Sequence, residues 1–153
     1  LKKRFPYSDV TATDFSTPAI SLAKENAILN KVDIDFILHD ILDGSDFLKD
    51  NFDLIVSNPP YVKEEEKQTM KRNVLDYEPH NAIFVKNDKP LVFYKAIASF
   101  AGKSLNTGGI IVLEINENLA QETKKVFDEY GFKNAEIIKD LFKKDRFLIV
   151  SND

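Results

Sequence analysis

Short β-type segments alternate with helical patterns along this chain of 153 residues, and the alternation predicts an α/β fold built on a mostly parallel sheet. Apolar spacing typical of helices lies between most of the β-type segments. The last two segments are joined by a short connection, which favours an antiparallel final strand. The length predicts a single domain. Strands are expected at residues 10–14, 34–38, 53–57, 110–115, 135–138 and 147–150.

The first third of the chain reads as strand, helix and strand. After the strand "VTATD", Thr17 is the expected N-cap of a helix that has Pro18 at its first position. The strand "IDFIL" follows, and a short helix is expected around Phe47. The apolar run at 53–57 suits a buried central strand. The apolar residues at helical spacing in the first helix are Ala19, Leu22, Ala23 and Ala27.

A long segment at 61–88 shows little periodicity, and a segment of this length in a compact domain is usually functional or holds a short helix. Pro90 then opens a helix that Gly108 is placed to end. Its expected inward face is Tyr94, Ile97, Ala98, Ala101 and Leu105, and the lone Met70 is a further core candidate.

The last helix begins after the strand at 110–115. Asn118 and Gln121 have the spacing of a capping box, and Gly131 is placed to stop the helix. The residues expected to face inward are Thr123, Val126, Phe127 and Tyr130.

Composition is that of an ordinary globular protein, with 43% hydrophobic and 30% charged residues. The chain has no Cys, which excludes disulfides and fits a reducing compartment such as the cytoplasm. With only two His and no thiolate, a metal site is not expected. The net charge of −4 gives no general attraction to nucleic acid, and no apolar run reaches the ~18 residues of a membrane span.

Polar residues lie at or near the ends of several expected strands. They are Asp14, the pair His39-Asp40, Asn58 and Glu114. Ligands of open α/β sheets bind beyond the carboxyl ends of the strands. Four polar positions on one expected edge therefore indicate a site there.

The segment "NPPY" at 58–61 follows directly after an expected strand. The side-chain carbonyl of Asn58 and the backbone carbonyl of Pro59 can accept both hydrogens of one planar NH₂ group. Pro59 and Pro60 stiffen the corner, and the Tyr61 ring can stack on a flat acceptor. An amide or amino-purine nitrogen is a poor nucleophile, so the chemistry indicated is transfer of a cationic methyl group to such a nitrogen. The alternative is that the segment has no catalytic role and is a Pro-Pro turn that closes the strand.

Several segments, quoted as they stand here, resemble the release factor glutamine methyltransferases (the HemK family) of class I S-adenosylmethionine enzymes. They are "TATDFSTPAISLAKENA", "FDLIVSNPPYV", "DYEPHNAI", "GGIIVLEI" and "DLFKKDR". The resemblance runs through nearly the whole chain. It implies a Rossmann-like class I methyltransferase sheet.

The resemblance also implies residue roles. Asn58, Pro59, Pro60 and Tyr61 would be catalytic, and Glu78 would join Asn58, Pro59 and Tyr61 in binding the substrate. The implied contacts to S-adenosyl-L-methionine come from Asp14 to the ribose hydroxyls, Asp40 to the adenine amino group, Ile41 to the ring, and also Phe15 and Asn58. Glu114 is expected at the pocket edge or in a structural role. His39 and His80 are expected to be solvent-facing or loop residues. The run Glu64–Glu66 and the segment "KDRF" are expected to be solvated faces.

Two departures from the family accompany the resemblance. The family's first strand with its acidic, Gly-rich turn, and its N-terminal helical domain, are expected before Leu1, which would leave a slot between the strands that end at Asp14 and Asn58. Residues 1–153 are therefore expected to be a partial catalytic domain. Asn116 stands where the family usually has Gly.

Three readings of function remain open. The first is N5-methylation of a glutamine side chain in a peptide chain release factor, the expected protein partner. The second is N6-adenine methylation of DNA or RNA on a flipped or single-stranded base. The third is a catalytically inert fragment. The acidic balance argues mildly against the second.

Overall fold

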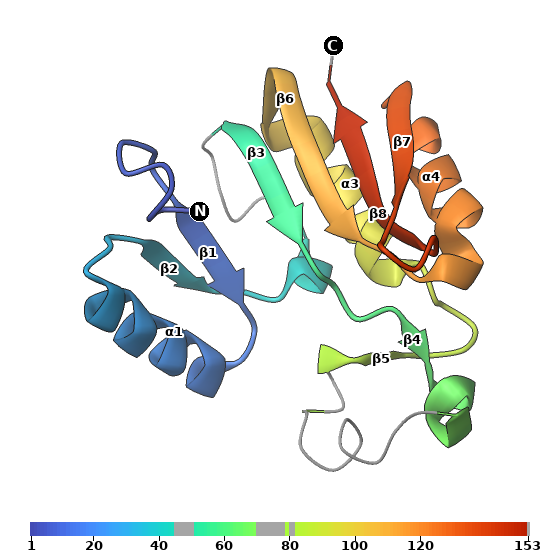
Figure 1. Cartoon of the computed structure of the whole chain (residues 1–153), viewed down its shortest axis with the longest axis horizontal. Helices are drawn as coiled ribbons and strands as arrows, with labels where there is room; N and C mark the ends of the chain where they lie inside the picture. The colour runs from blue at the N-terminus through green and yellow to red at the C-terminus, as the bar shows by residue number, and fades with distance from the viewer. Residues whose placement is uncertain (45–50, 70–78, 80–81, 153) are drawn as a thin grey trace. The chain divides into compact units, whose positions relative to one another are not determined.

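The computed structural model describes residues 1–44, 51–69, 79 and 82–152, which form two compact units, residues 1–47 and 48–153 (Figure 1). The expected helix around Phe47 and the core candidate Met70 lie outside the described residues. The single domain expected from length stays a prediction.

The first unit is a β-α-β arrangement. Strand β1 (Thr11–Asp14) pairs in parallel with β2 (Asp35–Leu38), and helix α1 (Thr17–Asn30) connects them. A short 3₁₀ helix, η1 (Ile41–Asp43), follows β2 and was not expected. The parallel pairing requires the crossover that α1 supplies.

Two details of α1 differ from expectation. Ser16, not Thr17, is the N-cap: its backbone is extended, and its side chain accepts a hydrogen bond from the Ala19 N–H at 3.4 Å. Thr17 is already helical, so Pro18 takes the second helical position. Leu22 is exposed, contrary to expectation, whereas Ala27 is buried as expected and Ile20 is buried with it.

The second unit holds a four-stranded sheet in the order β3 (Phe52–Ser57), β6 (Leu105–Glu114), β8 (Asp145–Ser151) and β7 (Asn134–Lys139). β3 and β6 are parallel, whereas β8 runs antiparallel to both β6 and β7. This confirms the expected α/β fold with an antiparallel last strand. A second, small parallel sheet joins β4 (Val62–Lys63) to β5 (Phe84–Val85), and the 3₁₀ helix η2 (Glu64–Thr69) lies between them in the chain.

Helices α3 (Val92–Ser104) and α4 (Ala120–Glu129) pack against each other and against this four-stranded sheet (Figure 1). Alternate residues of β6 and β8 are buried there, as the two-residue period of a strand requires. None of the helices in the described ranges is both long enough and apolar enough to cross a bilayer. The largest fully buried side chains are Tyr94, Phe127, Ile111, Leu113, Ile115, Leu148 and Val150.

The opposite face of the four-stranded sheet keeps apolar side chains in contact with solvent. The expectation that 53–57 is a buried central strand is wrong here: among the described strands β3 pairs only with β6, and Leu54 and Val56 are 41% and 53% exposed. β1 and β3 belong to separate hydrogen-bonded sheets. Ile110, Phe147 and Ile149 share the exposed face by strand register.

Glycines and caps in the second unit show where local patterns mislead. α3 ends at Ser104, and Gly108 (φ +74°) lies inside β6 instead of ending the helix. Asn118 and Gln121 form no capping box, because Asn116 caps a 3₁₀ helix, η4 (Glu117–Leu119), and α4 starts after it. Gly131, with φ +97°, stops α4 as expected. Tyr130 is 44% exposed, contrary to expectation.

Leu148→Ala is expected to lower the free energy of unfolding by about 2–5 kcal/mol, because it opens a cavity beneath α4 in the fully buried layer. The matched control is Leu141→Ala, at a position that is 99% exposed, which should change it by less than ~0.5 kcal/mol. Urea unfolding measures both. Equal losses for the two variants would show that the packing of β8 is wrong.

Candidate functional site

Two carboxylates lie at one edge of the first unit. Asp14 is the last residue of β1, and its Oδ1 accepts a hydrogen bond from the Ser16 N–H at 2.8 Å. Asp40 follows β2, and its Oδ1 accepts from the Leu42 N–H at 2.9 Å, which caps η1. Register pairs Asp14 with Leu38, so the two strands end at the same level. The structure therefore brings these two expected site residues to one edge.

In each of these carboxylates, one of the two oxygens accepts a backbone hydrogen bond. Within the described part of the chain, neither Oδ2 atom accepts a hydrogen bond, while each Oδ1 is fixed by a backbone donor. Phe15 follows Asp14 and is about half exposed, and Ile41 follows Asp40 and is partly exposed. Oriented carboxylates beside apolar side chains can hold a ligand that combines hydroxyl or amino donors with a flat ring.

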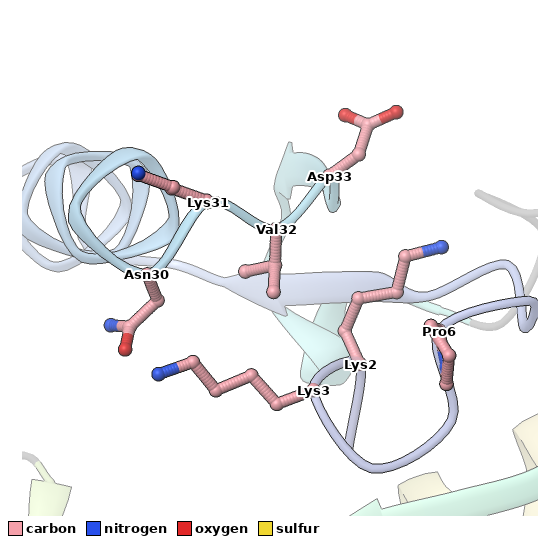
Figure 2. Close-up of a pocket in the computed structure, with 7 residues that line it drawn as sticks. All are labelled: Lys2, Lys3, Pro6, Asn30, Lys31, Val32 and Asp33. Atoms are coloured by element: carbon pink, nitrogen blue, oxygen red, sulfur yellow. The ribbon is translucent and has the colours of Figure 1, made fainter.

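A pocket of about 260 Å³ lies elsewhere in this unit, at the amino ends of the strands (Figure 2). It is lined by Lys2, Lys3, Pro6, Asn30, Lys31, Val32 and Asp33, which precede β1 or lie between α1 and β2. This is the opposite end of β1 and β2 from Asp14 and Asp40. The pocket is not part of the site that the sequence predicts.

The Asn-Pro-Pro-Tyr corner leaves the carboxyl end of β3 in the second unit. Asn58 is exposed, Pro59 is buried, and Pro60 and Tyr61 are partly buried. β4 begins at the next residue. The pairing of Ser57 with Leu113 of β6 fixes the start of the corner. An accessible amide is thus presented from a stiff, anchored segment.

Tyr61 is held at both ends by residues at the carboxyl end of β6. Its hydroxyl donates to Glu114 Oε1 at 2.6 Å, and its backbone carbonyl accepts from Asn116 Nδ2 at 3.1 Å. Tyr94 supports the same strand end, donating from its hydroxyl to the Glu114 carbonyl at 3.0 Å. The ring and the main chain of Tyr61 are therefore fixed independently. Glu114 was expected either at the pocket edge or in a structural role, and its hydrogen bond to Tyr61 supports the structural role.

A cation lies next to this pair. Arg146 Nη1 is 3.9 Å from Glu114 Oε1, and Arg146 Nε donates to Asp140 Oδ2 at 3.3 Å. Asp140 accepts backbone hydrogen bonds from Lys144 and Phe142, and these donors with Arg146 hold its carboxyl pKa below the ordinary value. The expectation that "KDRF" is only a solvated face is wrong for Arg146, which is two-thirds covered and joined to Glu114.

The protonation state of Tyr61 follows from this setting. Burial raises the pKa of Tyr61 to about 12, and the hydrogen bond to Glu114 and its negative charge add to the effect. Burial likewise raises the pKa of Tyr94. At neutral pH the Tyr61 hydroxyl is therefore a neutral donor already committed to Glu114. The hydroxyl is therefore not available as a general base at neutral pH.

Sequence reasoning missed the residues that hold Tyr61. Asn116 carried one signal, its departure from the family's usual Gly. Glu66 carried no such signal, since it lies in an acidic run expected to be solvated. In the structure its Oε1 accepts from the Lys63 N–H at 3.0 Å and lies 3.4 Å from Asn116 Nδ2. His39 lies in the loop after β2, as expected, with Nε2 3.2 Å from the Gly44 carbonyl.

Glu78 and His80 lie outside the described residues. In the ranges that are described, no group of three or more His, Cys, Asp or Glu is arranged to hold a metal ion.

Comparison with known proteins decides the family. The model of the family "Methyltransferase small domain" matches residues 1–77, which is half of the chain. The chain belongs to this methyltransferase family. The match includes β1, β2, β3 and the Asn-Pro-Pro-Tyr corner.

Individual methyltransferases are similar over more of the chain. A release factor glutamine methyltransferase from Flavobacterium psychrophilum is 44% identical over 99% of this chain and 53% of the relative. One from Bacteroides thetaiotaomicron is 37% identical over 97% of this chain and 53% of the relative. The chain thus spans about half the length of these relatives.

Solved structures share the fold. A methyltransferase from Pyrococcus furiosus superposes with a TM-score of 0.65 at 21% identity, covering 97% of this chain and 65% of that one. A 16S rRNA N2 G1207 methyltransferase from T. thermophilus, in complex with AdoMet and guanosine, gives a TM-score of 0.64 at 16% identity over 95% of this chain and 32% of that one. The expected class I methyltransferase fold is confirmed.

The raised pKa of Tyr61 predicts a change of stability in alkali. The folded state holds the phenol proton up to about pH 12, whereas the unfolded chain loses it near pH 10. The stabilisation is therefore complete below about pH 10 and is lost as the pH rises toward 12. Tyr61→Phe should lose less stability than wild type over this window in urea unfolding. Tyr7→Phe, at a fully exposed position, should follow wild type; identical behaviour of the two variants would contradict the assignment.

Proposed function

We propose that this chain is part of an enzyme that transfers a methyl group from S-adenosyl-L-methionine to the side-chain amide nitrogen (N5) of a glutamine in a peptide chain release factor. The observation that carries the proposal is the Asn58–Tyr61 corner, with an accessible amide and a doubly held tyrosine. It occurs in a chain that is 37–44% identical to release factor glutamine methyltransferases over nearly its full length.

The corner supplies two acceptors for the target NH₂ group. Asn58 Oδ1 and the Pro59 carbonyl each accept one hydrogen, which orients the nitrogen lone pair and raises its electron density. The Tyr61 ring stacks on the planar amide, and Pro60 keeps the corner stiff. Since the amide nitrogen becomes acidic once it bonds to the methyl group, its proton leaves without a strong base. This agrees with a Tyr61 hydroxyl that stays protonated.

The residues of the first unit fit the nucleoside part of the proposed cofactor. Asp14 and Asp40 each offer one unpaired carboxylate oxygen, suited to ribose hydroxyls and to an adenine amino group, respectively. Phe15 and Ile41 provide apolar surface for the ring, and Asn58 is assigned to the methyl-donor end. The cofactor supplies an electrophilic methyl group: a C–N bond forms as the C–S bond breaks, and the nitrogen releases a proton.

Local charge favours a protein over a nucleic acid as the substrate. The corner is followed by Glu64, Glu65 and Glu66, and Tyr61 contacts Glu114. Lys63 lies 3.4 Å from Glu65 and Arg146 lies 3.9 Å from Glu114, so the carboxylate charge is partly balanced and argues only mildly against a phosphate backbone. Glu78 is proposed to line the acceptor side. A release factor as substrate places the reaction in the cytoplasm.

Asn58→Ala tests the acceptor role. The assay uses a chimera in which this chain replaces the matching part of the Flavobacterium psychrophilum relative. The relative supplies the rest of its own sequence. Loss of one preorganised acceptor should lower turnover about 10²–10³-fold. Cofactor affinity should change much less. Asn26→Ala, an exposed helical position, is the matched control and should keep wild-type turnover.

The same chimera separates the readings of function when a release factor and an adenine-containing oligonucleotide compete for methylation. Transfer to the release factor alone is the expected result. Transfer to the oligonucleotide alone would keep the corner chemistry and overturn the substrate. Transfer to neither would favour the inert reading, and normal turnover by Asn58→Ala would refute the acceptor role.

Asp14→Asn tests the cofactor assignment. The variant keeps the shape of the side chain but replaces a carboxylate oxygen with an amide group, so a charge-assisted hydrogen bond to a ribose hydroxyl is lost. Such a bond contributes about 1.5–3 kcal/mol, which corresponds to a 10- to 100-fold weaker Kd for S-adenosyl-L-methionine in calorimetry. Asp9→Asn, at an exposed position before β1, should leave the Kd unchanged. Equal affinities for both variants would remove Asp14 from the cofactor site.

A further inference from the structure

The Asn-Pro-Pro-Tyr corner has few internal degrees of freedom. Proline rings lock φ of Pro59 and Pro60 near −65°, and the β3–β6 pairing at Ser57 holds the start. The direction in which the Asn58 amide and the Pro59 carbonyl point therefore depends on how the far end of the corner is held. That far end is Tyr61.

The main chain at Tyr61 is held from two directions: the next N–H, that of Val62, donates to the Ile83 carbonyl at 3.1 Å, and a side chain donates to the Tyr61 carbonyl. Asn116 Nδ2 donates to the Tyr61 carbonyl at 3.1 Å, across 55 residues of sequence. Asn116 is 6% exposed and Tyr61 is partly buried, so this bond is partly shielded from water. The residue before it, Ile115, is fully buried and donates from its N–H to the Arg146 carbonyl at 2.9 Å, so the main chain that carries Asn116 is itself fixed.

The amide of Asn116 is used at both ends. Oδ1 accepts from the Asn118 N–H at 2.9 Å and caps η4, while Nδ2 serves Tyr61 and lies 3.4 Å from Glu66 Oε1. The amide carries its donor and its acceptor on separate atoms, so one side chain makes both bonds at once. Aspartate can cap a helix but has no donor, and serine can cap a helix but has a single, shorter-reaching oxygen in place of the separate Oδ1 and Nδ2 atoms of Asn116.

We propose that Asn116 is a positioning residue of the catalytic corner: it fixes the Tyr61 carbonyl and thereby the geometry in which Asn58 and Pro59 meet the acceptor amide. This rests on the proposed function of the corner. The Asn116–Tyr61 bond itself does not, so the two can fail separately. The competing view is that Asn116 is only the cap of η4.

Asn116→Ser separates these roles, because serine keeps the cap and removes the donor. In the chimera, kcat for methyl transfer should fall about 10- to 100-fold, since small misplacements of reacting groups cost rate steeply. KM for S-adenosyl-L-methionine and the unfolding midpoint in urea should stay close to wild type. Asn118→Ser is the matched control: its side chain makes no hydrogen bond within the described ranges, and all three quantities should stay unchanged.

A second measurement on this chain needs no catalysis. Selective ¹³C labelling of tyrosine carbonyls should show the Tyr61 resonance shift in Asn116→Ser and not in Asn118→Ser, because only the first variant removes its hydrogen-bond donor. An unshifted resonance would overturn the contact. A shifted resonance with unchanged kcat would overturn the positioning role and leave Asn116 as a cap. A wild-type chimera that methylates nothing would overturn the proposed function, and the resonance would still decide the contact.

Discussion

The parallel pairing of β3 with β6 is the constraint on which the second unit's site depends. It sets two strand ends side by side, one leading into Asn58 and the other ending at Glu114. Because β6 also pairs with β8, its carboxyl end is held from both sides. Hydrogen bonds from both ends of Tyr61 to residues at this strand end tie the segment that follows β3 to the four-stranded sheet.

That arrangement divides the work between rigid backbone and exposed side chain. Pro59 is buried and the Tyr61 hydroxyl is committed to Glu114, whereas the Asn58 amide stays accessible. Arg146 balances part of the Glu114 charge. Backbone N–H groups of the following turn fix the Asp140 carboxylate, and this carboxylate accepts from Arg146 and so orients it. The ion pairs are partly exposed and contribute little to stability by themselves. Their value lies in keeping the carboxylate of Glu114 directed at the tyrosine.

Strands, parallel crossovers and strand-end residues could be predicted from the sequence because they depend on short-range periodicity. The same reasoning failed where two neighbouring residues compete for one local role. Ser16 and Thr17 can both cap α1, and Asn116 and Asn118 can both begin a helix, so the sequence does not choose between them. Gly108 illustrates a further ambiguity, since a positive φ serves a helix end and an irregular strand equally.

Burial and long-range contacts could not be predicted for a different reason. Leu54 and Val56 read as buried because they are apolar, but their exposure depends on which elements cover that face of the sheet. The bonds from Tyr61 to Glu114 and Asn116 span 53 and 55 residues, a separation at which no local pattern carries information. A motif can therefore single out Asn58 and Tyr61 as site candidates, because their residue types carry the chemistry that the motif suggests. The residues that contact Tyr61 have no distinctive type or spacing in the sequence, and only the folded strand ends show that Glu114 and Asn116 lie within hydrogen-bonding distance of it.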